Sequence, residues 1–597
     1  MNSTRHEIST SPSTSSHIHH HNNHHNSGQH TALMEATKNG PSYNTFGMGP
    51  EPPRNRHLTK DDLGLEDLGY RPELKRNFSK LETFGVAFSI MGVVPSIAST
   101  IWYNLPYGGP VSMIWGWLLS AGLISFIGFA MADLASSMPT SGGLYYWTHR
   151  LAPPKYQNFL AWFVGYNSFL GNVAAVSSLA WACSGMFFAC ASVANEDFSA
   201  SIGAQVGLYI GILVFCGVFC AYGTTVFARL QTPSVILNVV LALVTIIGLP
   251  IARRGQLNSA KFTFGGWANL TSWPNGFAFL LSFLAPVWTI CSFDCAVSIS
   301  EEAANASIAV PAAIVGAISS AGILGTLILI MVALSMGPDV AAVNESAIGQ
   351  PLAYVYLMAF GQKGSLAIWS LICVSQVSMT ASLVLPSSRQ AFAFARDGAL
   401  PFSNYFHHVD KWTGTPVRTV WLVVGAAVPL GFLGFADPEN QAAINAIFAL
   451  AIMGPYVAYG VPIFARIFWK RTFVPGPWYL GRASVPVAWV AVVWMIFAFV
   501  LFSFPGDKNP APGEMNYAIV VTAAVWLFAT VFWFTSGRHY FTGPRTEDLS
   551  DEIAADFATQ AGVKPTEDPN KKQASVTVLP VDDDDDSGKG KSVSVVN

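Results

Sequence analysis

The sequence predicts an all-α integral membrane protein with about twelve membrane-spanning helices. Among its 597 residues, 51% are apolar and only 11% are charged, whereas a soluble domain contains roughly 25% charged residues. The charged residues also gather at the two ends of the chain and in a few loops, between long apolar runs. This combination is typical of helices that lie in lipid.

Both ends of the chain are predicted to be disordered cytoplasmic tails around a membrane domain at 78–545. Residues 1–77 are polar, rich in Ser, Asn and His, and contain no apolar run of the kind that a signal peptide has. Residues 546–597 are also polar and include the acidic run 582–586. The histidine-rich stretch 17–25 is interpreted as polar low-complexity sequence, with metal binding as the alternative.

The apolar runs give the positions of the expected spans, because a membrane-crossing helix needs about 20 apolar residues. The runs of sufficient length lie near residues 82–103, 111–137, 158–191, 203–225, 231–251, 276–299, 309–336, 352–388, 417–435, 441–468, 484–504 and 516–536.

The distribution of Lys and Arg predicts that both termini are cytoplasmic. With this orientation, most basic residues of the connecting loops, such as Arg229 and Arg418, lie on the inside. The two glycosylation sequons that begin at Asn269 and Asn344 then lie in outside loops, which agrees with this topology.

The first expected span carries polar and helix-breaking residues at mid-membrane depth, among them Gly92, Pro95 and Ser96. Pro95 removes an internal hydrogen bond of the helix. Unpaired backbone in hydrocarbon persists only where it lines a cavity or is covered by protein. The interruption therefore suggests a cavity, with a simple proline kink as the alternative.

The sixth span has a matching interruption at 285–294, which also places the carboxylate of Asp294 inside an apolar segment. Two broken spans in corresponding positions predict an inverted repeat of 82–251 and 276–468, followed by two extra helices at 484–536, with substrate at the repeat interface. Intramembrane carboxylates usually face the protein interior. The alternative for Asp294 is a hydrogen bond to the end of its own broken helix.

Broken helices can bind a small zwitterion through their backbone ends. Half-helix N-termini offer N–H groups to an anion, and half-helix C-termini offer carbonyls to a cation. We expect a substrate carboxylate near the N–H groups of 96–98 and an ammonium near the carbonyls of 288–292, where Trp288 can also cover the amine. The expected substrate-binding residues are Gly92, Pro95, Ser96, Ile97, Ala98, Asn167, Trp288, Thr289, Ile290, Ser292 and Tyr456.

Other classes of function are not supported by the sequence. The net charge of -3 and the absence of a basic stripe argue against nucleic-acid binding. The core of the sequence contains no nucleophile–base pair, phosphate loop or metal-ligand cluster, so we expect neither an enzyme nor a bound metal or cofactor. The seven cysteines lie in apolar segments and are expected to be small buried side chains.

Three stretches of the chain carry a family resemblance: ADLASSMPTSGGLYYW at 132–147, SEEAANASIAVP at 300–311 and SRQAFAFARDGALP at 388–401. Together with PSIAS at 95–99 and VPGPWYL at 474–480, they resemble the fungal GABA permease and amino acid/choline transporter group of the amino acid–polyamine–organocation permease superfamily. The resemblance extends over about residues 75–545.

The resemblance implies a leucine-transporter-like fold, with a 5+5 inverted repeat in which helices 1 and 6 are broken. It also implies a secondary active transporter that works by alternating access, with a proton as the coupling ion. Asp294 and Glu302 are the candidate proton sites, since a buried carboxyl can bind and release a proton. Arg389, Arg396 and Asp397 can form ion pairs at the cytoplasmic surface, so they are candidates for an inner gate.

The leading hypothesis is a proton symporter for GABA or a related amino acid in the plasma membrane, with the vacuolar membrane as the alternative location. The first rival is a permease for choline, a polyamine or another organic cation, for which Asp294 would supply the counter-charge. The second rival is a nutrient sensor that retains the transporter fold. The expected partners are the small-molecule substrate, the proton and the lipid bilayer.

Overall fold

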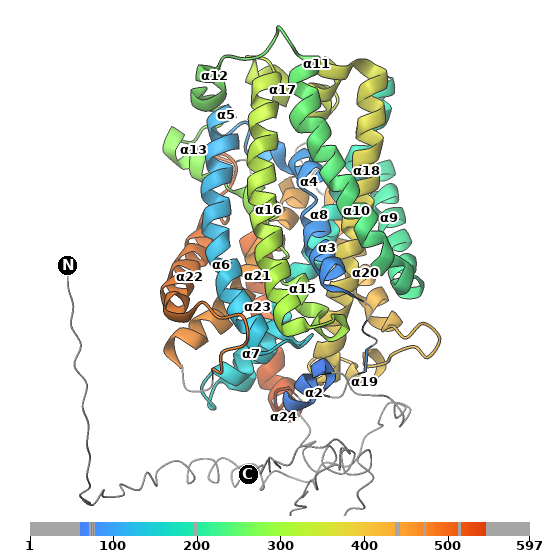
Figure 1. Ribbon diagram of the computed structural model, residues 1–597, viewed down its shortest axis with the longest axis vertical. Helices are drawn as coiled ribbons and strands as arrows, with labels where there is room; N and C mark the ends of the chain where they lie inside the picture. Colours follow the sequence, from blue (N-terminus) through green and yellow to red (C-terminus); the bar gives the residue numbers. More distant parts are fainter. Residues whose placement is uncertain are drawn as a thin grey trace, which may run out of the picture. The chain divides into compact units, whose positions relative to one another are not determined.

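In the computed structural model, the described part of the chain is built from helices (Figure 1). The structure describes residues 60–544 except 71, 72, 75, 77, 196, 197, 199, 436–441, 470–472 and 511–514. Within these residues, the only extended pairings are two isolated bridges, which join Phe78 to Ala303 and Tyr107 to Asn269.

Eleven helical segments among the described residues are long and apolar enough to cross a membrane. The first consists of α3 (Lys80–Met91), α4 (Val93–Thr100) and the short η1 (Ile101–Tyr103), and the second of α5 (Gly109–Val111), η2 (Ser112–Gly116) and α6 (Trp117–Ser137). The others are α8 (Gln157–Ala194), α9 (Ile202–Tyr222), α10 (Thr224–Leu243) with η3 (Val244–Gly248) and α11 (Leu249–Ala252), α16 (Ala306–Ser335), α18 (Pro351–Arg396), α20 (Val417–Gly431) with η5 (Phe432–Phe435), α21 (Ala442–Phe468), η7 (Gly481–Ala483) with α22 (Ser484–Leu501), and α23 (Ala518–Phe532) with η9 (Trp533–Gly537) and α24 (Arg538–Tyr540).

The sixth expected span is divided into short pieces. It consists of α13 (Asn275–Leu281), α14 (Leu284–Thr289) and α15 (Cys295–Ser298). The eleven long segments and this divided one occupy the positions of the expected spans near 82–536. The predicted all-helical membrane architecture is therefore confirmed, including the interruption of the sixth span.

Short helices mark the two ends of the bundle. One end, called the tail end below, carries α2 (Lys60–Asp67), α7 (Gly143–Leu151) and α19 (Ser403–Phe406), and the other, called the loop end, carries α12 (Ala260–Gly265), α13 and α17 (Val340–Asn344) (Figure 1). The short η4 (Ser300–Glu302) follows α15.

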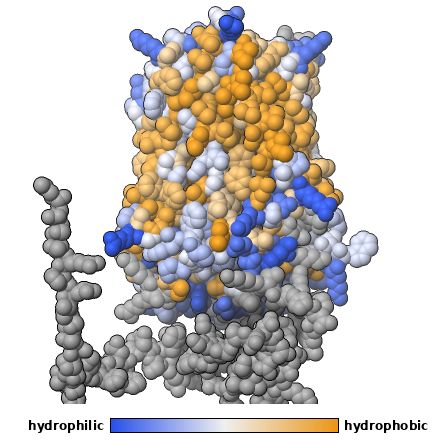
Figure 2. Space-filling model, in the orientation of Figure 1, coloured by the Kyte–Doolittle hydropathy of each residue, from blue (hydrophilic) through white to orange (hydrophobic). Residues whose placement is uncertain are grey.

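The surface between the two ends is apolar. Figure 2 shows a broad band of hydrophobic side chains, with hydrophilic residues gathered near both ends. Large apolar side chains such as Phe215, Ile323 and Val493 are more than half exposed on this surface. Exposed apolar area of this extent is compatible with lipid and not with water. The protein is a multi-pass integral membrane protein.

The long helices of the bundle pack closely against one another. Close contacts join α6 to α16, α8 to α18, α9 to α20 and α4 to α14. Small residues permit the approach, as is usual for membrane helices. A Cβ atom at Gly325 of α16 would clash with Trp117 of α6, and one at Gly165 of α8 would clash with Phe394 of α18.

The stretch before the first span differs from the expected disordered tail at 1–77. Helix α2 lies within that range, and Arg76 forms an ion pair of 2.8 Å with Asp62 in α2. The backbone N–H of Asn305 donates to Asp61 at 2.6 Å, and the N–H of Phe78 donates to the Glu302 carbonyl at 3.0 Å. The described part of this stretch is thus attached to the tail end of the bundle, by these polar contacts and by buried apolar side chains such as Leu65 and Leu74. The remainder of the expected tails, 1–59 and 546–597, lies outside the described residues.

Candidate functional site

The first span is broken at Gly92, between α3 and α4. Gly92 has φ 29° and ψ 72°, a conformation that favours glycine. Pro95 is the third residue of α4, where a missing N–H costs no helical hydrogen bond. The expected break at Pro95 therefore lies three residues earlier in the chain, and Pro95 starts the second half-helix instead of ending the first.

The position of this break changes which backbone groups are free. The N–H of Ser96 donates to the Gly92 carbonyl at 2.8 Å, and the Ser96 hydroxyl donates to the Met91 carbonyl at 2.7 Å. The Ser96 N–H, expected near a substrate carboxylate, therefore already has a hydrogen-bond partner in the chain. By the geometry of a helix start, the groups without a partner inside α4 are the N–H groups of Val93 and Val94.

The second break follows α14. This helix ends at Thr289, and Ser292 has φ 58°, which is uncommon for a residue with a side chain. The hydroxyl of Thr289 is buried and has no hydrogen-bond partner among the described residues. The last carbonyls of α14 also lack helical partners. The last carbonyls of α14 and the Thr289 hydroxyl therefore lie at the break, and α14 packs against α4.

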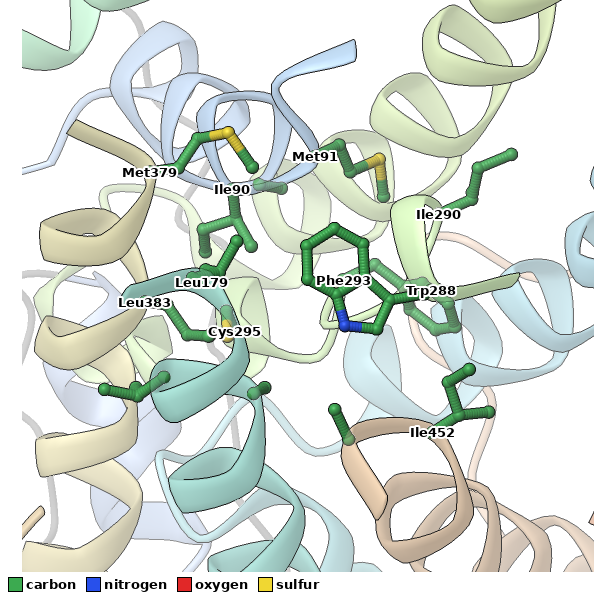
Figure 3. Close-up of a cluster of buried hydrophobic side chains, with 14 of the residues drawn as sticks. Ile90, Met91, Leu179, Trp288, Ile290, Phe293, Cys295, Met379, Leu383 and Ile452 are labelled. Atoms are coloured by element: carbon green, nitrogen blue, oxygen red, sulfur yellow. The ribbon is translucent and has the colours of Figure 1, made fainter. Parts of the chain in front are cut away.

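A small cavity of about 20 Å³ lies between the two breaks, with room for about one water molecule. It is lined by Ile90, Ser96, Ala175, Leu179, Trp288, Thr289, Cys291, Ser292, Leu383 and Ala451. Figure 3 shows the apolar side chains around it, with Trp288 at the centre and Leu179, Leu383 and Met379 on neighbouring helices. None of these lining residues is charged. We call this space the central cavity.

The side chain of Met379 in α18 lies against Gly92, at the break of the first span. A Cβ atom at Gly92 would clash with the Met379 Sδ atom, so a side chain there would require the Met379 side chain to move. The thioether side chain is flexible and can change its rotamer to admit a ligand.

Aromatic rings separate the central cavity from the loop end. The Trp288 ring lies 5.2 Å from the Phe448 ring, and the Phe448 ring lies 5.5 Å from the Tyr103 ring, measured between centroids. The Trp288 Nε1–H donates to Ser178 at 3.2 Å, which fixes the orientation of the indole. We call Trp288, Phe448 and Tyr103 the aromatic closure.

Asp294 is buried but does not line the central cavity. The Tyr459 hydroxyl of α21 donates to its carboxylate, and the side chain of Asp294 does not cap α15. Only 4% of Asp294 is exposed. The carboxylate therefore connects the broken sixth segment to the tenth span, and it is not positioned as a direct counter-charge for a ligand in the cavity.

Buried ion pairs close the tail end. Arg389 Nε lies 2.6 Å from Glu302 Oε1, and Arg396 forms two hydrogen bonds of 3.0 and 3.1 Å with the carboxylate of Glu301. All four side chains are at least nine-tenths buried. The N–H of Ser141 donates to the same Glu301 carboxylate at 3.0 Å. We call the two pairs the ionic closure.

Two tyrosines extend the ionic closure to Asp397. Tyr70 and Tyr145 donate to Asp397 Oδ2 at 3.0 and 2.7 Å, and the Arg396 guanidinium lies 4.1 Å from the centroid of the Tyr70 ring. Burial, followed by the nearby Asp397 charge, raises the pKa of Tyr70 and Tyr145 well above the usual range. Both phenols therefore remain donors at all physiological pH values. The ion pair of Arg389 is with Glu302, and that of Arg396 is with Glu301.

These contacts bring together the three stretches on which the family resemblance rests. Ser141 and Tyr145 belong to the first, Glu301 and Glu302 to the second, and the arginines and Asp397 to the third. Segments more than 80 residues apart thus build one network at the tail end.

The expected binding residues divide into three groups. Ser96, Trp288, Thr289 and Ser292 line the central cavity, whereas Gly92, Pro95, Ile97, Ala98 and Ile290 lie in the adjoining half-helices and breaks. Asn167 does not reach the cavity, because its amide accepts a hydrogen bond of 2.8 Å from Trp526 of α23. Tyr456 is buried beside Tyr459 and is not part of the cavity wall.

The sequence did not identify several residues of the site. Leu179, Leu383 and Ala451 line the cavity, but apolar residues inside apolar spans carry no signal of their position. Glu301 belongs to the site as well as Glu302, and two adjacent acidic residues after a broken span are the sequence signal for it. The expected glycosylation residue Asn269 lies in a loop-end turn, where its Nδ2 donates to the Trp273 carbonyl at 2.8 Å.

Known proteins share most of this chain. Residues 78–525 match a family model described as amino acid permease. The chain is 37% identical over 508 residues to the GABA-specific permease of Saccharomyces cerevisiae, which covers 83% of this chain and 88% of that protein. It is 35% identical over 495 residues to an uncharacterized amino-acid permease of Schizosaccharomyces pombe, covering 82% and 89%, and 33% identical over 498 residues to amino-acid permease 2 of Neurospora crassa, covering 83% and 91%.

The chain therefore belongs to the amino acid permease family. The members of this family are transporters and not enzymes.

Proposed function

We propose that this amino acid permease carries GABA or a related ω-amino acid as a zwitterion, bound in the central cavity between the two breaks. The main support is that the cavity wall has no charged side chain but adjoins the start of α4 and the end of α14, which pack against each other. The start of a helix attracts an anion and the end attracts a cation. A ligand that carries both charges satisfies both ends.

The substrate carboxylate lies, on this proposal, at the N–H groups of Val93 and Val94. The ammonium lies at the last carbonyls of α14, with the otherwise unpaired Thr289 hydroxyl beside it. Because the central cavity measures only about 20 Å³, the ligand must displace side chains such as Met379 and Leu383. The apolar wall then contacts the methylene chain of the substrate.

The organic-cation alternative is less well supported. A choline or polyamine cation needs a carboxylate within reach, and Asp294 neither lines the cavity nor lacks a hydrogen-bond partner. Such a ligand would also leave the N–H groups at the start of α4 without an anion. The resemblance to a GABA-specific permease at 37% identity supports the same choice.

We further propose transport by alternating access, with spans 1–5 and 6–10 as inverted repeats. The pairing of α6 with α16, α8 with α18 and α9 with α20 supports this, because these are spans 2 and 7, 3 and 8, and 4 and 9. The aromatic closure and the ionic closure then open in turn.

The tail end is taken as cytoplasmic because the basic loops lie there. The plasma membrane is the proposed location, with the vacuolar membrane as the alternative.

The proposed coupling ion is the proton, with Asp294 as its binding site. Asp294 is buried and accepts a hydrogen bond from Tyr459, so one proton can be accommodated without breaking an ion pair. Glu302 is the alternative, but its protonation would leave the buried Arg389 without its partner.

Asp294→Asn should lower proton-driven uptake by more than tenfold while exchange of internal for external substrate falls less. Equal loss of both activities at normal surface expression would assign Asp294 a structural role.

The proposal is tested by uptake of labelled substrates in a permease-deficient host, with external pH as the second variable. The panel contains GABA, other amino acids, choline and a polyamine. We expect saturable GABA uptake that increases at acidic pH and that excess choline does not abolish. If choline abolishes uptake and GABA does not, the substrate assignment is wrong.

A chain without residues 1–56 and 560–597 should retain uptake, whereas a sensor that uses these residues for signalling would be expected to transport nothing.

A further inference from the structure

A second and larger cavity lies at the loop end, beyond the aromatic closure. Its volume is about 270 Å³, compared with about 20 Å³ for the central cavity. Its wall comprises Tyr103, Tyr107, Leu281, Leu284, Ala446, Ala449, Phe502, Phe504, Pro505, Gly506, Asp507, Met515 and Asn516. We call it the loop-end cavity, and its volume approaches that of small-molecule sites in proteins.

The wall combines aromatic rings with one carboxylate. Two tyrosines and two phenylalanines line the cavity, and among the described residues of the wall Asp507 is the one that carries a charge. An acid among aromatic rings is the arrangement that binds organic ammonium groups, by charge and by cation–π contact. No Lys or Arg is among the described wall residues, so they offer an anion no positive partner.

Asp507 is held in place by hydrogen bonds. Its Oδ1 atom accepts from the N–H of Ser272 at 3.0 Å and from the Ser272 hydroxyl at 3.1 Å. Asn516 fixes the other side of the same segment, because its amide donates to the carbonyls of Phe502 and Phe504 at 2.8 and 3.1 Å. The carboxylate is therefore positioned by the surrounding chain and does not depend on a ligand for its orientation.

Tyr107 is close to this carboxylate and keeps its proton. Burial, and then the Asp507 charge, raises the pKa of Tyr107 to about 12. A Cβ atom at Gly506 would lie only 2.8 Å from the Tyr107 hydroxyl, so the phenol packs directly on this segment. The cavity thus presents a neutral phenol beside the Asp507 side chain.

The loop-end cavity is adjacent to the route toward the central cavity. Tyr103 lines the cavity and also contacts Phe448, which in turn contacts Trp288 above the breaks. A ligand in the loop-end cavity therefore lies against the outer side of the aromatic closure. Opening of the closure would connect the two cavities.

We propose that the loop-end cavity is a separate recruitment site that binds the ammonium group of an arriving amino acid at Asp507. The identity of the ammonium compound as an amino acid rests on the proposed function. The site increases the local concentration of substrate at the aromatic closure, and it makes no contact with the ligand once the closure has shut behind it.

The test compares the full chain with Asp507→Asn and Asp507→Glu. Asp507→Asn should raise the KM of GABA uptake about tenfold with kcat unchanged, because binding before the transport step is lost. Asp507→Glu keeps the charge and should stay within about twofold of the unchanged chain. Glu345→Gln is the matched control, since it removes an exposed carboxylate elsewhere at the loop end, and it should leave KM unchanged.

Binding of tetramethylammonium to the purified chain, measured by calorimetry, provides a readout that needs no transport. The unchanged chain should bind it and Asp507→Asn should bind at least tenfold more weakly. The inference is overturned if the unchanged chain and Asp507→Asn bind tetramethylammonium equally well. It is also overturned if the two proteins have the same KM for GABA uptake. Failure of the unchanged chain to take up any amino acid would contradict the proposed function, while a difference in tetramethylammonium binding would still support the cavity as an ammonium site.

Discussion

The two closures of the central cavity are made of different interactions. At the loop end, three aromatic rings contact one another at 5.2 and 5.5 Å, and each contact of this kind contributes roughly 0.5–1.5 kcal/mol beyond area burial. At the tail end, two buried ion pairs join segments that are distant in the sequence. Removing one member of a buried pair costs about 3–5 kcal/mol, because a charge is left without its partner.

The two closures should therefore differ in how they respond to salt and to the loss of a partner. Aromatic contacts adjust by small rotations and are insensitive to salt, whereas buried charges are either paired or strongly unfavourable. We therefore expect the ionic closure to act as the more switch-like of the two. Cys291 reports on both, since it lines the central cavity and only 5% of it is exposed.

The largest effect is expected from Glu302→Gln, which leaves Arg389 buried without an anion. Uptake should fall to background, and the purified protein should lose about 3–5 kcal/mol of stability. Cys291 should become reactive toward a thiol reagent applied from the tail end in inverted vesicles. Asp67→Asn, which alters an exposed acid of α2, is the control. Normal uptake in Glu302→Gln would show that the ionic closure does not hold the tail end shut.

A smaller effect is expected from Phe448→Leu, which removes both ring contacts of the aromatic closure. The cost should be roughly 1–3 kcal/mol for the two lost contacts. Cys291 should then react with a membrane-impermeant reagent applied from the loop end, and Cys291→Ser should abolish that signal. Phe464→Leu changes a lipid-exposed ring of the same helix and should have no such effect. Equal reactivity in both variants would remove Phe448 from the closure.

Tyr70→Phe should have a moderate effect on the ionic closure. The change removes one hydrogen bond to Asp397 while it keeps the ring beneath Arg396, at a cost of about 1–2 kcal/mol. Uptake should decrease severalfold, as measured by initial rates at equal surface expression. Tyr146→Phe loses only a hydrogen bond to the Leu68 carbonyl and should retain more activity. The reverse order would argue against a role of the Tyr70–Asp397 contact.

The smallest effect concerns Glu73 and His407, which lie 3.3 Å apart at the edge of the tail end. Burial acts to raise the pKa of Glu73, but the His407 hydrogen bond and the Arg396 charge together lower it. The stability from this lowered pKa is present above the ordinary pKa of a carboxyl and is lost as pH falls through the lowered value.

Glu73→Gln should therefore cost less than about 1 kcal/mol at pH 7. The difference in Tm between the two proteins should vanish toward pH 3. A difference that grows on acidification would contradict the sign of the Glu73 shift.

Much of the fold was predictable because lipid imposes simple rules on sequence. The apolar runs gave the spans, and Gly and polar residues within them indicated the two interruptions. The exact break was not predictable from Pro95, since proline is tolerated in the first turn of a helix. Gly92 carries the break because its φ of 29° favours glycine.

The partners of polar residues were harder to predict. Asn167 contacts Trp526 of α23, whereas Ser96 lines the cavity. Both are polar residues inside apolar spans, so the sequence does not show which of them faces the cavity. The segment around Tyr70 is held by buried side chains such as Leu74 and by partners such as Asp397, which lies more than 300 residues away in the chain. Composition alone does not reveal such contacts.

The most direct test of the central claim is protection of Cys291 by substrate. The rate of thiol modification is measured in the full chain during turnover, with Cys291→Ser subtracted as background, and with and without GABA at a concentration that saturates uptake. A ligand held between the two breaks should slow the modification of Cys291 severalfold. An unchanged rate at saturating GABA would show that the substrate binds elsewhere.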